Sequence, residues 1–416
     1  MNELLGVFKD RDLRRRILWT LGFLAFFRLL AVVPVPGIDS ARLKSALSGN
    51  NFFGLLNIFS GGALENVSII MLGVGPYITA SIIMQLLTMI FPSLKEIYQE
   101  AGETGRRKFN QYSRLLTVPL SFLQGYGLLT LLIRQGLISH VGTLALFTNV
   151  LIVAAGSILL MWLGELISEY GVGNGVSLVI FAGIVARIPR DIGQIFFQFD
   201  RSLLPTIIGF LVVAPIVVAG VVLLTEAERP IPVSYAKRVR GMRMYGGIST
   251  YLPIRVNQAG VIPIIFAISL LLFPSMIGNF LATSSNAILA KVGTILSTFL
   301  TNQLLYGVSY FLLVFLFTYF YTAITFDPDA ISSNLQKQGG FIPGIRPGPS
   351  TAEFLSRLIT RITFVGGLFL GIIAILPLAM QVITRVQTLT IGGTALLIVV
   401  SVVIETTKQI RAQLTL

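Results

Sequence analysis

The chain has 416 residues, of which 54% are hydrophobic and 12% are charged, with a mean hydropathy of +0.83. A soluble domain carries about 25% charged residues, so this composition excludes a water-soluble globular protein and indicates a chain that lies mostly in lipid. The absence of cysteine excludes disulfides, thiolate metal sites and cysteine nucleophiles.

Ten apolar segments follow one another along the chain. Their apolar runs are continuous, as in residues 261–273, whereas the strands of a membrane barrel alternate apolar and polar residues over about ten positions. Because backbone polar groups in lipid must pair within a helix or a closed barrel, continuous runs predict helices. The predicted membrane helices cover residues 17–33, 67–91, 115–135, 149–168, 176–189, 204–224, 259–278, 304–325, 359–380 and 389–408.

The basic residues indicate how these helices are oriented. An even number of helices places both termini on one side, and the basic residues before the first helix predict that this side is the cytoplasm. Of the 31 Lys and Arg residues, 22 fall on the predicted cytoplasmic side, 8 fall in outer loops, and Arg28 lies within the first helix. This distribution accounts for the net charge of +13 without nucleic acid, and it predicts a multi-pass membrane protein with cytoplasmic termini.

Three segments do not fit a simple helix bundle. Residues 52–66 are semi-apolar, contain two adjacent glycines and are too short to span a membrane, so we expect a re-entrant or surface half-helix on the outer side. The cytoplasmic loops 226–256 and 326–361 are long and rich in Arg, Gly and Pro, a composition that suits docking to a large partner. Five helices lie on each side of the chain midpoint, which is compatible with an inverted repeat.

Side chains that could support catalysis are scarce. The single histidine, His140, falls in a short outer loop, and no zinc-site, Walker or nucleophile-elbow motif is present. We therefore predict that the chain is not an enzyme and holds no metal or cofactor. The charged residues within or near the membrane segments are Arg28, Glu165 and Glu405, and we expect their side chains to reach the interfaces from helix ends.

Two long motifs carry a resemblance to a known family. They are residues 68–87, SIIMLGVGPYITASIIMQLL, and residues 162–177, WLGELISEYGVGNGVS. Three shorter motifs support them, at residues 34–37, 257–263 and 341–348. Essentially the whole chain resembles the SecY family, the channel subunits of bacterial protein translocases. The resemblance rests on these motifs, on their order along the chain and on the number of predicted helices.

The resemblance implies an all-α polytopic membrane protein, with ten transmembrane helices in two pseudo-symmetric five-helix halves around a central hourglass pore. The halves would be residues 1–190 and 191–416. At the waist of the pore, family members carry a ring of aliphatic side chains, which excludes water and ions but yields to a passing chain. The matching residues are Val74, Ile78, Ile180, Ile184, Ile265 and Ile398.

The resemblance also implies two moving parts. Residues 52–66 correspond to the family's plug, a short helix that closes the outer funnel, and the plug residues singled out here are Gly61, Gly62 and Leu64. A lateral gate would lie where helices 2 and 3 face helices 7 and 8. Hydrogen bonds between membrane helices contribute only ~0.6–2 kcal/mol, which suits a seam that must part. The polar residues that match this gate are Thr79, Gln124 and Asn257.

The two long cytoplasmic loops match the family's docking sites for the ribosome and for the SecA motor ATPase. Cationic loops bind RNA phosphates through salt-dependent contacts. The candidate docking residues are Lys237, Arg238, Arg240, Arg243, Lys337 and Arg346, of which Arg346 is the strongest candidate. The other partners that the resemblance implies are the SecE and SecG subunits, signal sequences, translocating polypeptides and membrane lipids.

The implied function is that of a passive conduit in the bacterial plasma (inner) membrane. It would pass unfolded secretory polypeptides across the membrane and release transmembrane segments sideways through the lateral gate, driven by the motor or the ribosome. The alternative is a secondary transporter for a small solute, which would explain the ten helices and an inverted repeat. That alternative leaves the basic docking loops, the apolar waist and the plug-like segment unexplained.

Overall fold

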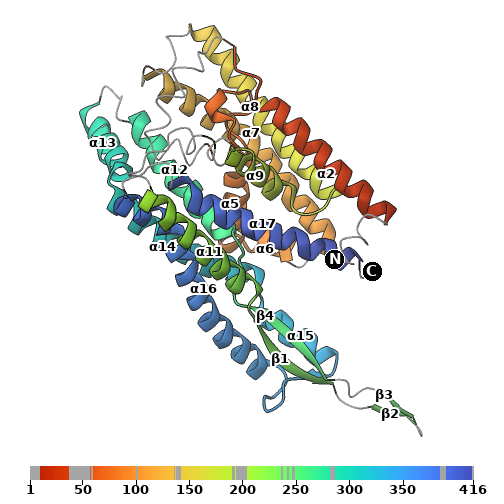
Figure 1. Cartoon of the computed structure of the whole chain (residues 1–416). Helices are drawn as coiled ribbons and strands as arrows, with labels where there is room; N and C mark the ends of the chain where they lie inside the picture. Colours follow the sequence, from red (N-terminus) through yellow and green to blue (C-terminus); the bar gives the residue numbers. More distant parts are fainter. Residues whose placement is uncertain are drawn as a thin grey trace.

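The protein is an elongated bundle of helices with a β-hairpin projecting from one end (Figure 1). The structure, a computed structural model, describes residues 10–36, 57, 60–99, 102–134, 136, 142–189, 193, 204–235, 238–240, 243–245, 249–281, 286–384 and 390–414.

The elements of the first half are almost all helical. They are α2 (Arg11–Leu30), the short 3-10 helix η1 (Leu64–Asn66), α5 (Gly75–Ile90), α6 (Pro92–Gln99), α7 (Gly102–Arg134), α8 (Thr143–Tyr170) and α9 (Gly175–Val185). The second half adds strands to its helices. Its elements are α11 (Leu204–Glu226), β1 (Glu228–Tyr235), β2 (Arg238–Arg240), β3 (Arg243–Tyr245), β4 (Ser249–Arg255), α12 (Ile262–Leu281), α13 (Ala287–Thr301), α14 (Gln303–Thr325), α15 (Pro328–Lys337), β5 (Gly340–Phe341), α16 (Pro349–Thr384) and α17 (Thr390–Leu414).

Each of the ten predicted membrane segments lies on a helix, so the helical prediction is confirmed. These helices are α2, α5, α7, α8, α9, α11, α12, α14, α16 and α17. By length and composition, four stretches of the described chain are able to cross a membrane alone: Gly102–Ile133, Thr143–Tyr170, Leu304–Lys337 and Pro349–Leu376. A fifth is the pair α5 and α6, which is bent by 117°. Other apolar helices of the described chain, such as α9, are shorter.

Two predicted helix boundaries differ from the structure. The second segment becomes helical only at Gly75, because residues 67–74 form turns in which Gly73 has a positive φ of 62°. Pro76 in the first turn of α5 has no N–H to donate, which fits a helix start. In the third segment, α7 begins at Gly102, well before residue 115. The polar residues before 115 do not end the helix, because a helix outside the lipid can carry polar side chains.

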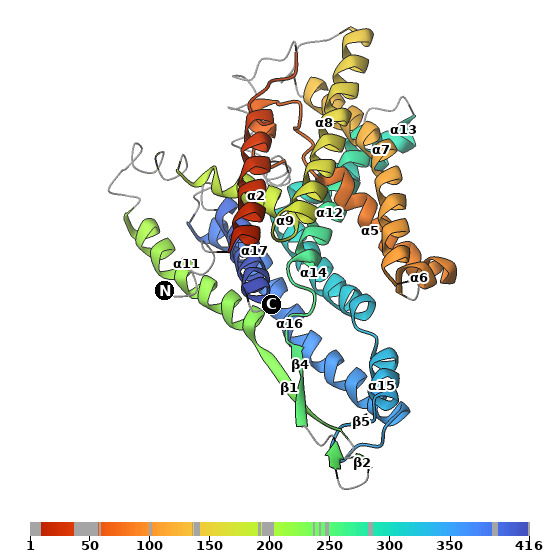
Figure 2. The same cartoon turned by 90° about the vertical axis from the view of Figure 1, so that its right-hand side faces the viewer.

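The long loop predicted at 226–256 is largely a β-hairpin. Strands β1 and β4 pair antiparallel from Glu228 opposite Arg255 to Ser234 opposite Ser249, and β5 pairs with the other edge of β1. Along β1, Ile231 and Val233 are buried and alternate with exposed prolines, which is the period of a half-buried strand. This small sheet, α15 and the start of α16 share a separate hydrophobic core and project together from the bundle (Figure 2).

Glycines allow several elements to pack by direct backbone contact. A Cβ on Gly156 of α8 would lie 2.1 Å from the carbonyl oxygen of Ile69, and a Cβ on Gly175 would lie 1.9 Å from the carbonyl oxygen of Gly164. The hydroxyl of Ser157 donates to the carbonyl of Gly73 at 2.9 Å, which supplies a partner for a buried turn. These contacts fix α8, α9 and residues 67–74 as one packed unit.

Candidate functional site

The six aliphatic residues that match the family's ring converge in the main core of the structure. All are buried, and all belong to one continuous hydrophobic cluster. Val74 and Ile78 lie at the start of α5, Ile180 and Ile184 on α9, Ile265 on α12 and Ile398 on α17. Residues four apart share one face of a helix, so α5 and α9 each present two side chains. We call these six residues the aliphatic cluster.

Residues 60–66, here called the 60–66 segment, rest on α2 and α9. Gly61 and Gly62 have positive φ values of 63° and 84°. A Cβ on Gly183 would lie 2.0 Å from the Cα of Gly61, and a Cβ on Gly61 would lie 2.5 Å from the ring of Phe27. Gly61 and Gly183 therefore have no room for a side chain, and Gly61 also has a backbone conformation that other residues rarely adopt.

Polar contacts tie the 60–66 segment to α2. The guanidinium of Arg28 donates from Nη1 to the carbonyl oxygen of Gly61 at 3.2 Å. The side-chain amide of Asn66 donates to the carbonyl of Ala31 at 3.3 Å. Within the segment, the Ser60 hydroxyl accepts from the Leu64 N–H at 3.1 Å, and Leu64 is fully buried. The segment is therefore held by α2 and also packs on α9.

The end of this segment is strained. Val67 has φ = 47°, and it is the only non-glycine residue with positive φ among the described residues. A β-branched residue in this region is a genuine outlier, with a cost of roughly 1–2 kcal/mol. Two backbone hydrogen bonds to residues 33–35 hold Val67 in this conformation. The Val35 N–H donates to the Val67 carbonyl at 2.8 Å, and the Ile69 N–H donates to the Val33 carbonyl at 3.0 Å.

Sequence reasoning missed two participants in this contact. We expected the Arg28 side chain to reach the membrane interface, but its guanidinium bonds to Gly61. A single cation within an apolar helix is a signal that it has a buried acceptor, and this signal was available in the sequence. Gly183 gave no such signal, because a close approach between two glycines distant in the chain leaves no local pattern.

The three predicted gate residues separate into a pair and a single residue. The side-chain amide of Gln124 on α7 donates to the Thr79 hydroxyl on α5 at 3.3 Å. The Thr79 hydroxyl in turn donates to the Gly75 carbonyl at 3.0 Å. Asn257 precedes α12, and its amide donates to the Gly260 carbonyl at 3.2 Å, while its Oδ1 is buried without a partner in the described chain. Helix α12 packs against both α5 and α7.

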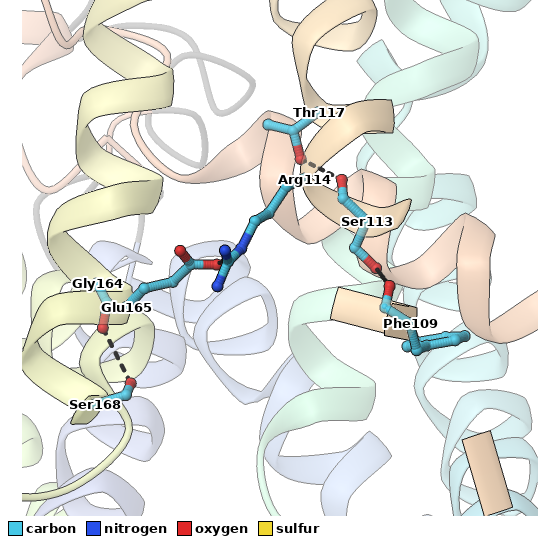
Figure 3. Close-up of polar contacts among 7 residues, drawn as sticks. All are labelled: Phe109, Ser113, Arg114, Thr117, Gly164, Glu165 and Ser168. Atoms are coloured by element: carbon cyan, nitrogen blue, oxygen red, sulfur yellow. Dashed lines mark hydrogen bonds and ion pairs between the residues drawn. The ribbon is translucent and has the colours of Figure 1, made fainter. Parts of the chain in front are cut away.

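An ion pair joins α7 to α8 (Figure 3). The Arg114 Nε lies 2.5 Å from Oε1 of Glu165, whose side chain is four-fifths buried. Figure 3 also shows the neighbouring Ser113 and Thr117 hydroxyls, which bond to carbonyls of their own helix at 3.2 and 2.7 Å. Glu165 therefore has an ion-pair partner, which the sequence did not indicate. Since Arg114 is half exposed, the pair contributes about 1 kcal/mol at most.

The predicted docking residues gather at the projecting end of the molecule. Arg238 and Arg240 lie on β2 and Arg243 on β3, with Arg240 opposite Arg243 in the register. Lys337 ends α15 and Arg346 follows β5, and both side chains are exposed. The Arg346 carbonyl accepts from the Thr351 hydroxyl at 2.9 Å, which fixes its turn. Lys237 lies outside the described residues.

Comparison with known proteins identifies the class and the family. A model of the SecY family matches residues 68–407. The SecY subunit of the protein translocase of Mycobacterium bovis is 44% identical over 97% of this chain and 95% of its own length. A solved protein-conducting channel aligns with a TM-score of 0.63 at 21% identity, covering 96% of this chain and 92% of that chain. The channel in a canine ribosome–channel complex from the endoplasmic reticulum aligns with a TM-score of 0.60 at 20% identity, covering 96% and 92%.

The fold is thus that of the ten-helix, polytopic, all-α membrane channels. The chain belongs to the SecY family. It is a channel-forming subunit of a protein translocase, and it is not an enzyme.

The contact between Gly61 and Gly183 gives a direct test of how the 60–66 segment is held. We expect Gly183→Ala to push the segment away from α9, because the new Cβ would meet the Gly61 backbone at 2.0 Å. Hydrogen–deuterium exchange of the Gly62 and Ser68 amides, which bond to Asn57 and Ala63, should then accelerate. Gly22→Ala is the matched control, because nothing lies within 4 Å of its Cβ position. Equal exchange in both variants would show that the contact does not hold the segment.

Proposed function

We propose that the aliphatic cluster is the waist of a passive protein-conducting pore between the halves 1–190 and 191–416. The observation that carries this proposal is the convergence of the six buried side chains, four from the first half and two from the second. Branched apolar side chains offer no hydrogen bonds to water or ions, so a narrow ring of them blocks leakage. They still yield to an unfolded chain of any sequence, because the contact is non-directional.

We assign the 60–66 segment as the described part of the plug. Its glycine contact with α9 and its hydrogen bonds to α2 support this assignment, since the segment is held by a few contacts and is not part of a membrane-spanning helix. The strained backbone of Val67 lies where the segment meets the packed turns of 67–74, so the plug would swing about this residue. In this mechanism Arg28 positions the resting plug, and opening breaks its bond to the Gly61 carbonyl.

The seam between α5 and α12 is the proposed lateral gate. The bond between Thr79 and Gln124 ties α5 to α7, and the ion pair between Arg114 and Glu165 ties α7 to α8. The first half would therefore move as one body, and α12, which packs against α5 and α7, would part from it. The buried, unpaired Oδ1 of Asn257 marks the start of α12 as a place where an entering segment gains a hydrogen bond.

The projecting hairpin, α15 and the Arg346 turn form the proposed docking surface for the ribosome and the SecA motor. Basic residues on β2, β3 and α15 suit RNA phosphates, whose binding weakens with salt. The structural likeness to a channel solved in a ribosome–channel complex supports a ribosome partner. The proposal includes SecE, SecG, signal sequences and translocating polypeptides as partners. It places the chain in the bacterial inner membrane with both termini in the cytoplasm, as the excess of basic residues on that side favours.

Site-specific crosslinking tests the conduit directly. A photoreactive residue at Ile78 should crosslink to a secretory chain arrested in mid-translocation, and it should do so only when that chain is present. A photoreactive residue at Ile216, which is exposed on α11, is the control and should give no crosslink to the arrested chain. Engagement of the substrate elsewhere without any crosslink at Ile78 would rule out the aliphatic cluster as the waist of the pore.

The apolar character of the waist should determine the resting ion conductance. Replacing Ile78, Ile180 and Ile265 together by Asn is expected to hydrate the waist and raise the conductance of the resting channel in planar bilayers. The triple Leu variant preserves the apolar surface and should conduct like the original protein. A triple Asn variant that is correctly inserted and conducts no more than the Leu variant would rule out the aliphatic cluster as the seal.

The docking role of Arg346 predicts a loss of transport without a loss of folding. Arg346→Glu should strongly reduce motor-driven or ribosome-coupled secretion, while an exposed charge change alters stability by only about 0.5 kcal/mol. Arg346→Lys should retain part of the activity if charge alone matters. Transport is to be measured with inverted membrane vesicles, normalised to inserted protein. A parallel fall in inserted protein would assign Arg346 a structural role.

A further inference from the structure

Helix α13 was not expected from the sequence, and the proposed channel mechanism gives it no role. It joins α12 to α14 and packs against both. The Asn286 side chain caps its first turn by accepting from the Ile288 N–H at 3.1 Å. Asn302 ends α13 and also caps α14, accepting from the Leu304 N–H at 3.1 Å. Two caps and a shared corner residue make α13 a defined helix and not a loose connection.

One face of α13 is apolar and exposed. Its residues Ile288, Val292 and Ile295 are 73%, 42% and 62% exposed, and at 3.6 residues per turn they fall within an arc of about 60°. Lys291 and Thr294 lie together on one side of this stripe, and Gly293 is buried on the other. The helix therefore has three sides: one packed on the protein, one polar and one apolar without a protein partner in the described chain.

The two helices that flank α13 also expose apolar side chains where they join it. Ile277 near the end of α12 and Leu304 and Val308 at the start of α14 are 47%, 73% and 51% exposed. Both views place α13 at the end of the bundle opposite the β-hairpin (Figures 1 and 2). An amphipathic helix at the edge of an apolar belt has the arrangement of a helix that lies in the membrane interface.

We propose that α13 is an interfacial anchor that inserts its apolar stripe among phospholipid acyl chains of the leaflet farther from the hairpin. Lys291 is its only charged residue. Lysine at a membrane interface lays its apolar stem along the apolar surface and keeps its ammonium among the headgroups. A docking protein would need more polar groups for specificity, whereas acyl chains require only apolar area. Because α13 packs along α12, the anchor ties one side of the gate to the bilayer and couples that side to lipid thickness.

Tryptophan quenching by brominated phospholipids tests the anchor. The chain has two tryptophans, so Trp19→Phe and Trp162→Phe give a silent background. Ile295→Trp in proteoliposomes should then be quenched roughly twofold or more beyond Thr294→Trp, its neighbour on the polar side. If Ile295→Trp lowers the thermal unfolding temperature, Ile288→Trp replaces it as the probe.

The outcomes separate lipid from other occupants and from the channel assignment. Equal quenching at residues 294 and 295, or none at either, would overturn the proposal. Rapid reaction of Ile295→Cys with a water-soluble thiol reagent in liposomes, but protection in native membranes, would assign the stripe to a protein partner and also overturn it. Because the native chain has no cysteine, the label reports one position. None of these measurements depends on transport. A result that overturns the membrane anchor therefore does not affect the proposal that the chain conducts polypeptides.

Discussion

A backbone in lipid must find all of its hydrogen bonds within the protein, and this constraint shapes every irregular segment of the structure. Residues 31–36 and 60–74 contain no α-helix, and each segment donates hydrogen bonds to the other. Val35 and Ile69 donate to carbonyls across the two segments, Asn66 and Arg28 cap further carbonyls, and Ser157 supplies the Gly73 carbonyl with a donor. The described parts of these two segments are therefore held to each other and to their neighbours by hydrogen bonds that are few and individually weak.

The helical part of the fold was predictable because hydrophobicity is a local property. Ten continuous apolar runs specify ten helices whatever their neighbours are, and all ten are present. The β-hairpin was missed although Ile231 and Val233 alternate with other residues in its first strand, because prolines and arginines there favoured a loop interpretation. Helix α13 was missed because its apolar residues are interrupted by Lys291 and Gly293, which makes the segment too weakly hydrophobic to stand out from an outer loop.

The candidate site was predictable to a smaller extent, and for a different reason. The positions of the aliphatic cluster came from motifs, since an isoleucine in a membrane helix carries no local sign of its role. The structure gathers all six, and it joins Thr79 to Gln124. It leaves Asn257 bonded within its own turn, because a hydrogen-bond partner across helices depends on rotation and depth that a sequence does not encode locally. The pairing of Arg114 with Glu165, fifty-one positions apart, depends on tertiary packing in the same way.

The glycine contact under the 60–66 segment also determines what is left behind when the segment moves. A segment fixed by a large side chain in a socket would open an empty cavity on leaving, at a cost of about 2–5 kcal/mol for a leucine-sized knob. Gly61 and Gly183 contribute no side chains, so their separation opens no cavity and requires no neighbouring rotamer to change. Leu64, toward the other end of the segment, is fully buried in a second hydrophobic cluster with Met71 and Leu132, so the cavity cost of departure falls on that end. The segment therefore separates most easily at its glycine end, where it leaves α9.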